Sequence, residues 1–333
     1  MGKMKVIYFE RKRAKAGSME ILFSTIRKFL PESIVSEIFV PSVESKGVLK
    51  RLYIVIESLF HQGDVNHITG DIHFAALLLK RERTILTIHD CVSVIHSHGL
   101  KKELLKFFWY TLPLKKVRFV TVVSEKTKSE LLTLADFPQE RIFLIPDCAS
   151  DRFMPVEKKE FNARKPRILQ VGTRSNKNLV RVCEALKNIP CLLDIVGEMT
   201  SEQKTALQYN GIEFENTFDI SEDTLLEKYI NADIVSFVST YEGFGMPILE
   251  AQSVGRALLT SALSPMTEVA GEGACLVDPF DPADIRKGFV KIIDDAEYRN
   301  RIIGAGIENV KKYRPQKIAD MYVALYNKID SAT

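Results

Sequence analysis

The sequence predicts an α/β protein built from two doubly wound parallel-sheet domains. At 333 residues the chain is longer than a single hydrophobic core usually supports, so two domains are expected. Short apolar runs alternate with amphipathic helical segments almost throughout, which is the pattern of parallel sheets covered on both faces. An irregular, charged stretch from Asp147 to Pro166 divides the alternation into two similar halves, and we interpret it as a linker.

The first half is expected to open with a strand at Lys5–Phe9, followed by a helix that carries Ile21, Leu22, Ile26 and Phe29 on one face. Ser124 is predicted to cap a helix over Glu125–Leu134, because its hydroxyl can accept from a free N–H of the first turn. The later strands of this half are predicted at Ile54–Ile56, Thr84–Thr87, Phe119–Val123 and Ile142–Ile145.

The second half repeats the alternation and ends in an amphipathic helix. Its strands are predicted at Arg167–Val171, Leu192–Val196, Ile234–Val238, Leu258–Thr260 and Cys275–Val277. The terminal helix places Ile318, Met321, Tyr322, Leu325, Tyr326 and Ile329 at helical spacing, so it must cover another surface. We therefore expect an N-terminal domain of residues 1–155, a C-terminal domain of residues 156–314, and a helix within 315–333 that packs back on the N-terminal domain.

Composition favours a cytoplasmic globular protein. The start of the chain has no signal-peptide core, and no apolar run approaches the roughly 18 residues of a membrane span. Five scattered cysteines without a C-x-x-C pair are expected to be reduced, buried thiols. Residues 1–160 hold 26 Lys and Arg against 19 Asp and Glu, whereas the remainder holds 20 against 24. The basic N-terminal half and the more acidic C-terminal half are expected to bind different ligands.

The segment most informative about function is Tyr241-Glu-Gly-Phe-Gly-Met-Pro-Ile-Leu-Glu250, which follows an apolar run. Pro247 suits the first position of a helix, so Glu242 is expected in a strand-to-helix loop and Glu250 one turn into the helix. Gly243 and Gly245 allow the backbone to approach a ligand closely. Two carboxylates beside backbone donors and a helix N-terminus suit a ligand that carries both hydroxyls and an anion, such as a sugar or ribose attached to phosphate.

A second loop, Val171-Gly-Thr-Arg-Ser-Asn-Lys-Asn-Leu179, joins a strand to a helix. Gly172 permits a tight exit from the strand, Asn178 can cap the helix, and Arg174 and Lys177 supply positive charge beside its N-terminus. These features suit the binding of a diphosphate, although an ordinary strand-to-helix loop with solvated basic residues would have the same sequence pattern. Because the Glu242 segment lies in the same half, at the same end of the sheet, we favour the functional interpretation.

Glu242-x7-Glu250, combined with Gly172 and Lys177-Asn178, resembles the motifs of the retaining glycosyltransferases of family 4. The resemblance covers nearly all of the C-terminal half and is weaker in the N-terminal half, where it rests on Thr87–Asp90 and Gly17-Ser18. It implies the GT-B fold, in which two Rossmann-like domains face a central cleft. In the C-terminal half it extends to Tyr229–Asp233, Glu268–Gly271 and Leu276–Pro279.

The resemblance also implies roles for individual residues. Glu250 would accept the ribose hydroxyls, and Glu242 would lie against the transferred hexose. Lys177, with Arg174 as partner, would neutralise the departing diphosphate, although Thr173 stands where the family usually has its arginine. His89 would contact the sugar or its leaving oxygen from the acceptor-binding domain. The remaining donor-binding residues would be Gly172, Gly243, Phe244, Gly245 and Met246.

The expected reaction needs no metal and no cofactor. In glycosyl transfer the leaving group is a diphosphate, whose developing charge must be stabilised. Many transferases stabilise it with Mg²⁺ held by an Asp-x-Asp motif, which this chain lacks. Basic side chains and a helix dipole are expected to serve instead, and no histidine spacing suggests a metal site. The donor would be a nucleotide sugar, the acceptor a saccharide or a lipid-linked saccharide, and no nucleic acid is expected to bind. The setting would be bacterial surface polysaccharide or glycoconjugate synthesis.

Several alternatives stay open at this point. An epimerase acting on nucleotide sugars, or a non-catalytic subunit of the same fold, would share the fold, whereas a dehydrogenase is disfavoured because the first strand does not lead into G-x-G-x-x-G. His89 also fits a hydrogen-bonded strand end. Gly17 and Ser18 also fit a plain helix start instead of an acceptor or phosphate loop. The basic, aromatic run Lys101–Arg118 fits a core-packed helix, which we favour, or a patch that meets the inner face of a membrane.

Overall fold

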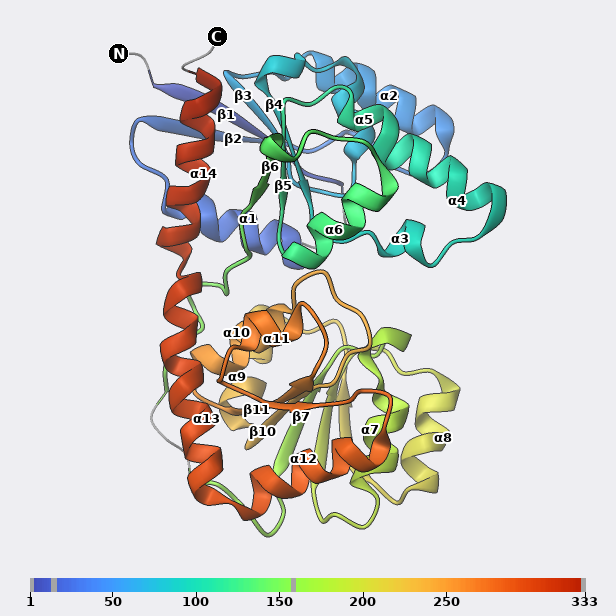
Figure 1. The fold of residues 1–333 in the computed structure, drawn as a ribbon, viewed down its shortest axis with the longest axis vertical. Helices are drawn as coiled ribbons and strands as arrows, with labels where there is room; N and C mark the ends of the chain where they lie inside the picture. Colours follow the sequence, from blue (N-terminus) through green and yellow to red (C-terminus); the bar gives the residue numbers. More distant parts are fainter. Residues whose placement is uncertain (1–2, 13–16, 157–159, 331–333) are drawn as a thin grey trace. The chain divides into compact units, whose positions relative to one another are not determined.

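The computed structural model describes residues 3–12, 17–156 and 160–330. The chain divides into two compact units, which are described separately. Unit 1 comprises Met1–Cys148 together with Pro315–Thr333, and unit 2 comprises Ala149–Arg314. Each unit contains one six-stranded sheet whose paired strands are all parallel, so the predicted α/β fold class with doubly wound sheets is confirmed (Figure 1).

The sheet of unit 1 has the strand order β2-β1-β3-β4-β5-β6. Its helices alternate with the strands, except that the last helix of the chain returns to this unit. The strands are β1 Met4–Phe9, β2 Ile34–Phe39, β3 Val65–Ile68, β4 Thr84–Ile88, β5 Phe119–Val122 and β6 Ile142–Leu144. The helices are α1 Ser18–Lys28, α2 Val48–Leu59, α3 Val92–Ile95, α4 Gly99–Lys106, α5 Leu112–Leu114, α6 Glu125–Leu134 and α14 Pro315–Asp330, with shorter turns η1 His73–Leu78, η2 Arg81–Arg83, η3 Phe107–Thr111 and η4 Gln139–Arg141.

The two faces of this sheet are covered by different helices (Figure 1). Alternation along β1 sends Val6 and Tyr8 towards α1 and α14, and sends Ile7 and Phe9 towards α2 and η1. The terminal helix α14 buries the predicted apolar positions Ile318, Tyr322, Leu325, Tyr326 and Ile329, whereas Met321 is 39% exposed.

A chain of buried hydroxyls attaches α14 to the sheet. The Tyr326 hydroxyl lies 2.9 Å from the Tyr8 hydroxyl and 2.8 Å from Nδ1 of His67, whose Nε2 lies 2.7 Å from the Thr87 hydroxyl. Burial, with a small contribution from His89, lowers the pKa of His67 to about 3. His67 is therefore neutral at physiological pH and can accept one hydrogen bond while it donates the other.

The sequence misassigned one element of unit 1 and missed two. The predicted strand at Ile54–Ile56 is wrong, because these residues lie inside α2. The run Tyr53–Ile56 is rich in β-branched side chains, which favours a strand locally, but packing against η1 overrides that preference. Strands β2 and β3 were not predicted. β3 reads Val-Asn-His-Ile, and its buried Asn66 and His67 break the apolar pattern of a central strand.

The sheet of unit 2 has the order β12-β11-β10-β7-β8-β9. Its strands are β7 Arg167–Val171, β8 Leu192–Val196, β9 Glu213–Thr217, β10 Ile234–Phe237, β11 Ala257–Ser261 and β12 Cys275–Val277. Its helices are α7 Leu179–Leu186, α8 Ser201–Tyr209, α9 Glu222–Asn231, α10 Met246–Ser253, α11 Met266–Ala270, α12 Pro282–Asp294 and α13 Ala296–Asn309, with the turns η5 Ser175–Lys177 and η6 Val310–Tyr313.

Sequence and structure agree closely in unit 2. The predicted strands at Arg167–Val171, Leu192–Val196 and Cys275–Val277 are confirmed to the residue, and the other two differ only at their ends. Strand β9 was not predicted, because this edge strand has the sequence Glu-Phe-Glu-Asn-Thr and lacks an apolar run. Among the residues that the structure describes, no helix has the length and apolarity needed to cross a membrane.

Candidate functional site

Two loops of unit 2 leave neighbouring strands at the same edge of the sheet. The chain builds outward from β7 through β8 to β9 and then returns to place β10 on the other side of β7. Because β7 and β10 are parallel and paired, the loops that follow them begin side by side. Ligands of open α/β sheets bind at such a reversal of strand order. The loop after β7 contains Gly172 and Lys177, and the loop after β10 contains Glu242.

Lys177 and Glu242 form an ion pair between these two loops. Nζ of Lys177 lies 2.6 Å from Oε1 of Glu242, and the two side chains are only 18% and 15% exposed. The Asn176 amide donates to the same Oε1 at 3.2 Å and to the Tyr241 carbonyl at 2.9 Å. The Thr240 N–H donates to the Asn176 carbonyl at 2.8 Å, so side chain and backbone both hold the loops together. The pair is thus a fixed cation beside a fixed anion at the edge of the sheet.

The absence of a side chain at Gly172 gives Lys177 its path. Gly172 has φ +91°, and a Cβ there would lie 3.0 Å from Cγ and 3.1 Å from Cε of Lys177. The Lys177 ammonium also lies 4.5 Å from the centre of the Phe237 ring on β10, a cation–π distance. The lysine stem therefore runs across Gly172 and is held between that backbone and an aromatic face, with its charge directed at Glu242.

The loop after β10 turns sharply into α10. Gly245 precedes the helix with φ +115°, and a Cβ there would lie 3.1 Å from Ile248 and 3.3 Å from Phe237. Gly243 and Phe244 are buried in this turn, and the Phe244 ring packs edge-on against Tyr313, so its ring is part of the core. Met246 begins the helix, which moves Pro247 to the second position instead of the predicted first. Pro247 has no N–H and the Ile248 N–H donates to the Gly245 carbonyl at 2.9 Å, so this turn offers an anion mainly the positive end of the helix dipole.

Glu250 lies one turn into α10, as the sequence indicates, and is held by Tyr229 of α9. The Tyr229 hydroxyl donates to Oε2 of Glu250 at 2.5 Å. Burial raises the pKa of Glu250 to about 7, against the opposing effects of the Tyr229 hydrogen bond and the Lys177 charge. The same burial, with the charge of Glu250, raises the pKa of Tyr229 well above its ordinary value, so the tyrosine stays a donor. Glu250 is thus a carboxyl group that changes charge near neutral pH.

In the loop after β7, Asn178 behaves differently from the sequence interpretation, whereas the predicted role of Arg174 stays a prediction. Asn178 precedes α7 with φ +62°, but its side chain does not cap the helix; its amide donates to the Pro279 carbonyl at 2.6 Å and its oxygen accepts from Arg181 at 3.0 Å. The predicted capping role of Asn178 is therefore wrong. Arg174 lies just before η5 with an exposed side chain. The Arg174 side chain is thus more exposed than that of Lys177, which is half-buried.

His89 lies in unit 1, directly after β4. Its Nε2 faces the Thr69 carbonyl at 3.3 Å, and its Nδ1 lies 3.7 Å from a carboxylate oxygen of Asp147. Burial lowers the pKa of His89, but the hydrogen bond and negative charge of Asp147 outweigh it, and the net pKa is raised. Because both ring nitrogens face acceptors, the structure favours the imidazolium form. Asp147 was not among the predicted site residues.

Gly17 and Ser18 form the start of α1 in unit 1. The Gly17 N–H donates to Oε2 of Glu20 at 2.8 Å, and Oε1 of Glu20 lies 3.4 Å from Arg11. Ser18 is the exposed first residue of the helix. A carboxylate of the chain itself therefore already sits at this helix N-terminus, and it would repel a phosphate there.

The sequence interpretation missed three polar residues that complete these arrangements. Tyr229 fixes Glu250, Asn176 bridges the two loops of unit 2, and Asp147 faces His89. Tyr229 and Asn176 stand inside the segments that carried the resemblance, so their positions were visible, but their hydrogen bonds depend on folding. Within the described part of the chain, no group of three or more His, Cys, Asp and Glu side chains could hold a metal ion.

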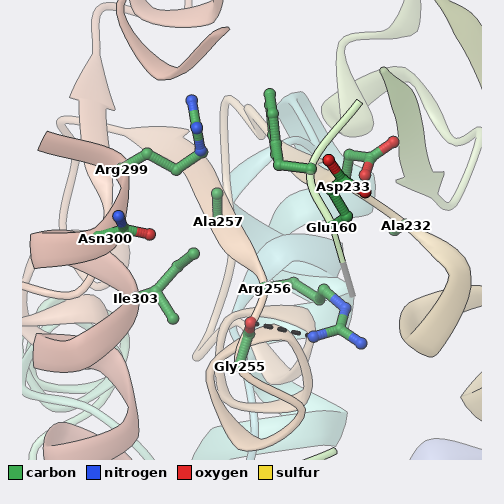
Figure 2. A pocket seen from close by; sticks show the side chains of 10 residues that line it. Glu160, Ala232, Asp233, Gly255, Arg256, Ala257, Arg299, Asn300 and Ile303 are labelled. Carbon is green, nitrogen blue, oxygen red and sulfur yellow. Dashed lines mark hydrogen bonds between the residues drawn. The ribbon is translucent and has the colours of Figure 1, made fainter. Parts of the chain in front are cut away.

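A cavity of about 290 Å³ lies at the opposite edge of the unit 2 sheet (Figure 2). Its lining includes Asp233 and Ala257, next to the amino ends of β10 and β11, with Arg256 and Arg299. Arg256 donates to the Ile230, Val254 and Gly255 carbonyls, which end α9 and α10. Arg299 donates to the Ile292 and Ile293 carbonyls near the end of α12. The two arginines therefore stabilise helix C-termini, and the cavity is separate from the Lys177–Glu242 pair.

Comparison with known proteins finds similarity to glycosyltransferases. Residues 154–309 match the family model of glycosyl transferases group 1. The O-antigen chain mannosyltransferase B of Escherichia coli is 25% identical in an alignment of 263 residues that covers 70% of this chain and 67% of that protein. In several other curated relatives the matched segment is only 24% to 30% of their length.

Solved structures reproduce the fold over nearly the whole chain. The sucrose-phosphate synthase of Thermosynechococcus elongatus superposes with a TM-score of 0.82 at 16% identity, covering 99% of this chain and 100% of that one. HepE of Anabaena, solved in complex with UDP and glucose, superposes with a TM-score of 0.78 at 14% identity, covering 98% and 100%. At such low identity these structures establish the shared fold alone.

Proposed function

We propose that this chain, a glycosyltransferase with the GT-B fold, transfers a hexose from a nucleoside diphosphate sugar to a saccharide or lipid-linked acceptor with retention of configuration. The observation that carries the proposal is the Lys177–Glu242 pair at the β7/β10 switch point, with Glu250 on the helix that follows. The two motifs also support assignment to the retaining enzymes of family 4. The group 1 match over residues 154–309 includes all three residues.

Stabilisation of the leaving diphosphate is the main catalytic demand of such a transfer. Lys177 offers a half-buried cation whose place is fixed by Gly172 and Phe237, and the N-terminus of α10 adds the positive end of a helix dipole. In the free protein Glu242 neutralises Lys177. When a donor binds, its diphosphate would draw the ammonium away from Glu242, which would leave that carboxylate available to a hydroxyl of the hexose.

Glu250 would hold the ribose. Its carboxyl group lies one turn from the helix start, at a depth where it can accept from vicinal hydroxyls while Tyr229 fixes its other oxygen. The HepE complex with UDP and glucose supports a nucleotide sugar as donor class for this fold. The E. coli O-antigen relative, a mannosyltransferase, makes mannose the first hexose to test and polysaccharide synthesis the first setting.

His89 would act from unit 1, which we propose binds the acceptor. Held as an imidazolium between Asp147 and the Thr69 carbonyl, it would offer a positive charge to the transferred sugar or its leaving oxygen. We assign no phosphate to Gly17 and Ser18, because Glu20 already occupies that helix start.

We further propose that transfer needs no metal and takes place in the cytoplasm, at the inner face of the membrane. The absence of Asp-x-Asp from the sequence and the presence of Lys177 support the first point. All five cysteines are free and buried, which suits a reducing compartment.

A donor screen tests the proposal. Purified protein would be incubated with UDP-, GDP- and ADP-sugars, with and without acceptor, and release of the nucleotide and the anomeric configuration of the product would be measured. We expect turnover with one donor, undiminished by EDTA, and a product with the anomeric configuration of the donor. Inversion, or full dependence on an added divalent ion, would contradict the mechanism. Conversion of one nucleotide sugar into another without acceptor would favour an epimerase, and no reaction would favour a non-catalytic subunit.

A further inference from the structure

Helix α2 of unit 1 is apolar on the side that faces away from the core. Its inner side buries Ile54, Val55 and Ser58. Its outer side exposes large apolar side chains at spacings of four, three and four residues, which form one continuous stripe along a helix. These are Leu49 (83% exposed), Tyr53 (51%), Ile56 (54%) and, just past its end, Phe60 (75%). A surface helix normally places polar residues there, so the stripe needs a partner.

The segment α4–η3 presents a second stripe of the same kind. Leu105 and Trp109 pack partly against the core, and Tyr110 is buried. The side chains of Leu100, Leu104, Phe107 and Phe108 are exposed, again at helical spacing, and Leu100 is 77% exposed. The run Lys101–Arg118 is therefore not simply the core-packed helix that the sequence favoured, because Leu104, Phe107 and Phe108 within it face outward.

The two stripes belong to the same side of unit 1. Both α2 and η3 pack on η1, and the guanidinium of Arg51 on α2 lies 4.5 Å above the ring of Trp109 on η3. Figure 1 shows α2, α4 and α5 together on the side of the sheet that α1 and α14 leave open. The apolar face is defined as Leu49, Tyr53, Ile56, Phe60, Leu100, Leu104, Phe107 and Phe108.

Basic residues accompany this apolar face. Residues 99–118 contain six Lys and Arg against one acidic residue, and residues 48–59 contain two against one. Lys50, Lys101 and Glu103 are exposed, and Lys102 and Lys106 are half-buried at the rim. The cores of protein–protein interfaces are depleted in lysine, whereas surfaces that rest on anionic lipid combine Lys and Arg with Leu, Phe and aromatic side chains.

We propose that the apolar face of α2 and α4–η3 is a docking surface for an anionic lipid bilayer. The eight apolar side chains enter the boundary between headgroups and acyl chains, and the lysines contact lipid phosphates. This surface would make the proposed contact with the inner face of the membrane, and it includes α2 as well as the run Lys101–Arg118. It does not depend on the transfer chemistry, because lipid binding is measured without donor or acceptor.

Vesicle co-sedimentation tests the proposal with the full chain. Phosphatidylcholine vesicles with and without phosphatidylglycerol would be compared at low and high salt. We expect binding that requires the anionic lipid and weakens with salt. The variant carrying Leu49→Glu and Phe60→Glu should partition at least about tenfold less, because it removes two inserted apolar side chains. Lys101→Glu with Lys102→Glu should lose about fivefold or more per lysine.

Tyr209→Glu is the matched control, because Tyr209 is 79% exposed on α8 of unit 2 and should leave binding unchanged. Trp109 is the single tryptophan of the chain and lies beside the face, so lipids brominated on their acyl chains should quench its fluorescence. Circular dichroism would verify that the variants are folded, and turnover with a soluble acceptor would be followed separately.

Equal partitioning of the wild-type chain and the α2 variant would overturn the proposal. So would self-association that Leu49→Glu abolishes in the absence of lipid.

Discussion

At the scale of single residues, the candidate site depends on how Lys177 is held. Its ammonium pairs with Glu242, its stem crosses the bare backbone of Gly172, and the Phe237 ring lies beneath its charge. A side chain at position 172 would lie 3.0 Å from Cγ of the lysine stem, so it would move the cation. The geometry thus accounts for a glycine at position 172 by contact with the lysine as well as by backbone conformation.

Substitution of Gly172 should therefore impair transfer. Gly172→Ala places a methyl group 3.0 Å from Cγ of Lys177 and forces a side chain into φ +91°, so we expect turnover to fall by about tenfold or more and stability by roughly 1 kcal/mol. Gly211→Ala is the matched control, because Gly211 also has positive φ (+64°) but a methyl group there would meet no described residue other than its chain neighbours within 4 Å. It should lose similar stability and keep its turnover. Steady-state kinetics and thermal unfolding would separate the two effects, and equal turnover in both variants would refute the contact.

The carboxyl group of Glu250 predicts a pH dependence of donor binding. Burial raises its pKa from 4.5 to about 7 in the ligand-free protein. The protonated form is therefore favoured by folding, and its contribution to stability is complete below about pH 4.5 and is lost as the pH rises through about 7. Because the ionised carboxylate accepts hydrogen bonds from ribose more strongly, affinity for the intact nucleotide sugar should rise several-fold across the same interval.

Isothermal titration calorimetry of the nucleotide sugar at a series of pH values measures this dependence. The intact donor is preferable to the free diphosphate, whose terminal phosphate titrates in the same range. Glu250→Gln should flatten the profile, since an amide has no proton to lose. The series should extend by roughly one to two pH units on either side of the expected midpoint near 7. A wild-type affinity that stays constant over this range would exclude this role for Glu250.

At the scale of elements, α14 is the segment whose attachment is most specific. It returns from the end of the chain to unit 1 and places the Tyr326 hydroxyl between Tyr8 and His67. Tyr326→Phe leaves both of these buried groups without that partner, so it should lower the free energy of unfolding by about 1–3 kcal/mol. Tyr53→Phe, at an exposed tyrosine of the same unit, should stay within about 0.5 kcal/mol. Urea unfolding followed by circular dichroism compares them, and equal stability of the two variants would contradict the account.

The elements also show what the sequence could and could not specify. Strands β7, β8 and β12 are buried apolar runs with clear ends, and Ser124 caps α6 by accepting from Thr127, as predicted. Helix α2 was mistaken for a strand because its run Tyr53–Ile56 is continuous, apolar and rich in β-branched side chains, which favours a strand locally. Edge strand β9 escaped because most of its residues are polar. In both cases the local pattern of apolar residues pointed away from the element that tertiary packing selects.

The site shows the same division. Glu242, Glu250 and Lys177 could be selected from motif spacing, because each motif follows directly from a strand end. Tyr229, Asn176 and Asp147 could not be given roles, because each meets its partner only through the order of strands in the folded sheet. The wrong cap at Asn178 has the same origin, since the Pro279 carbonyl that takes its amide lies 101 residues away.

At the scale of the whole molecule, two sheets of the same architecture carry different chemistry. Unit 2 gathers an ion pair, a titratable carboxyl group and a helix N-terminus at the reversal of its strand order. Unit 1 presents His89, whose pKa is raised by Asp147, and an apolar, basic outer surface. This division suits an enzyme that takes a soluble donor in one unit and an acceptor in the other.

The central claim is that Glu250 binds the nucleotide whereas Glu242 acts on the transferred sugar. Binding of the nucleoside diphosphate and turnover of the matched nucleotide sugar, measured on Glu250→Ala and Glu242→Ala, test it most directly. Glu250→Ala is expected to weaken nucleotide binding by about tenfold or more. Glu242→Ala is expected to leave nucleotide binding intact or tighter, because Lys177 is released, while turnover falls by about a hundredfold or more. Full turnover in both variants would contradict the account.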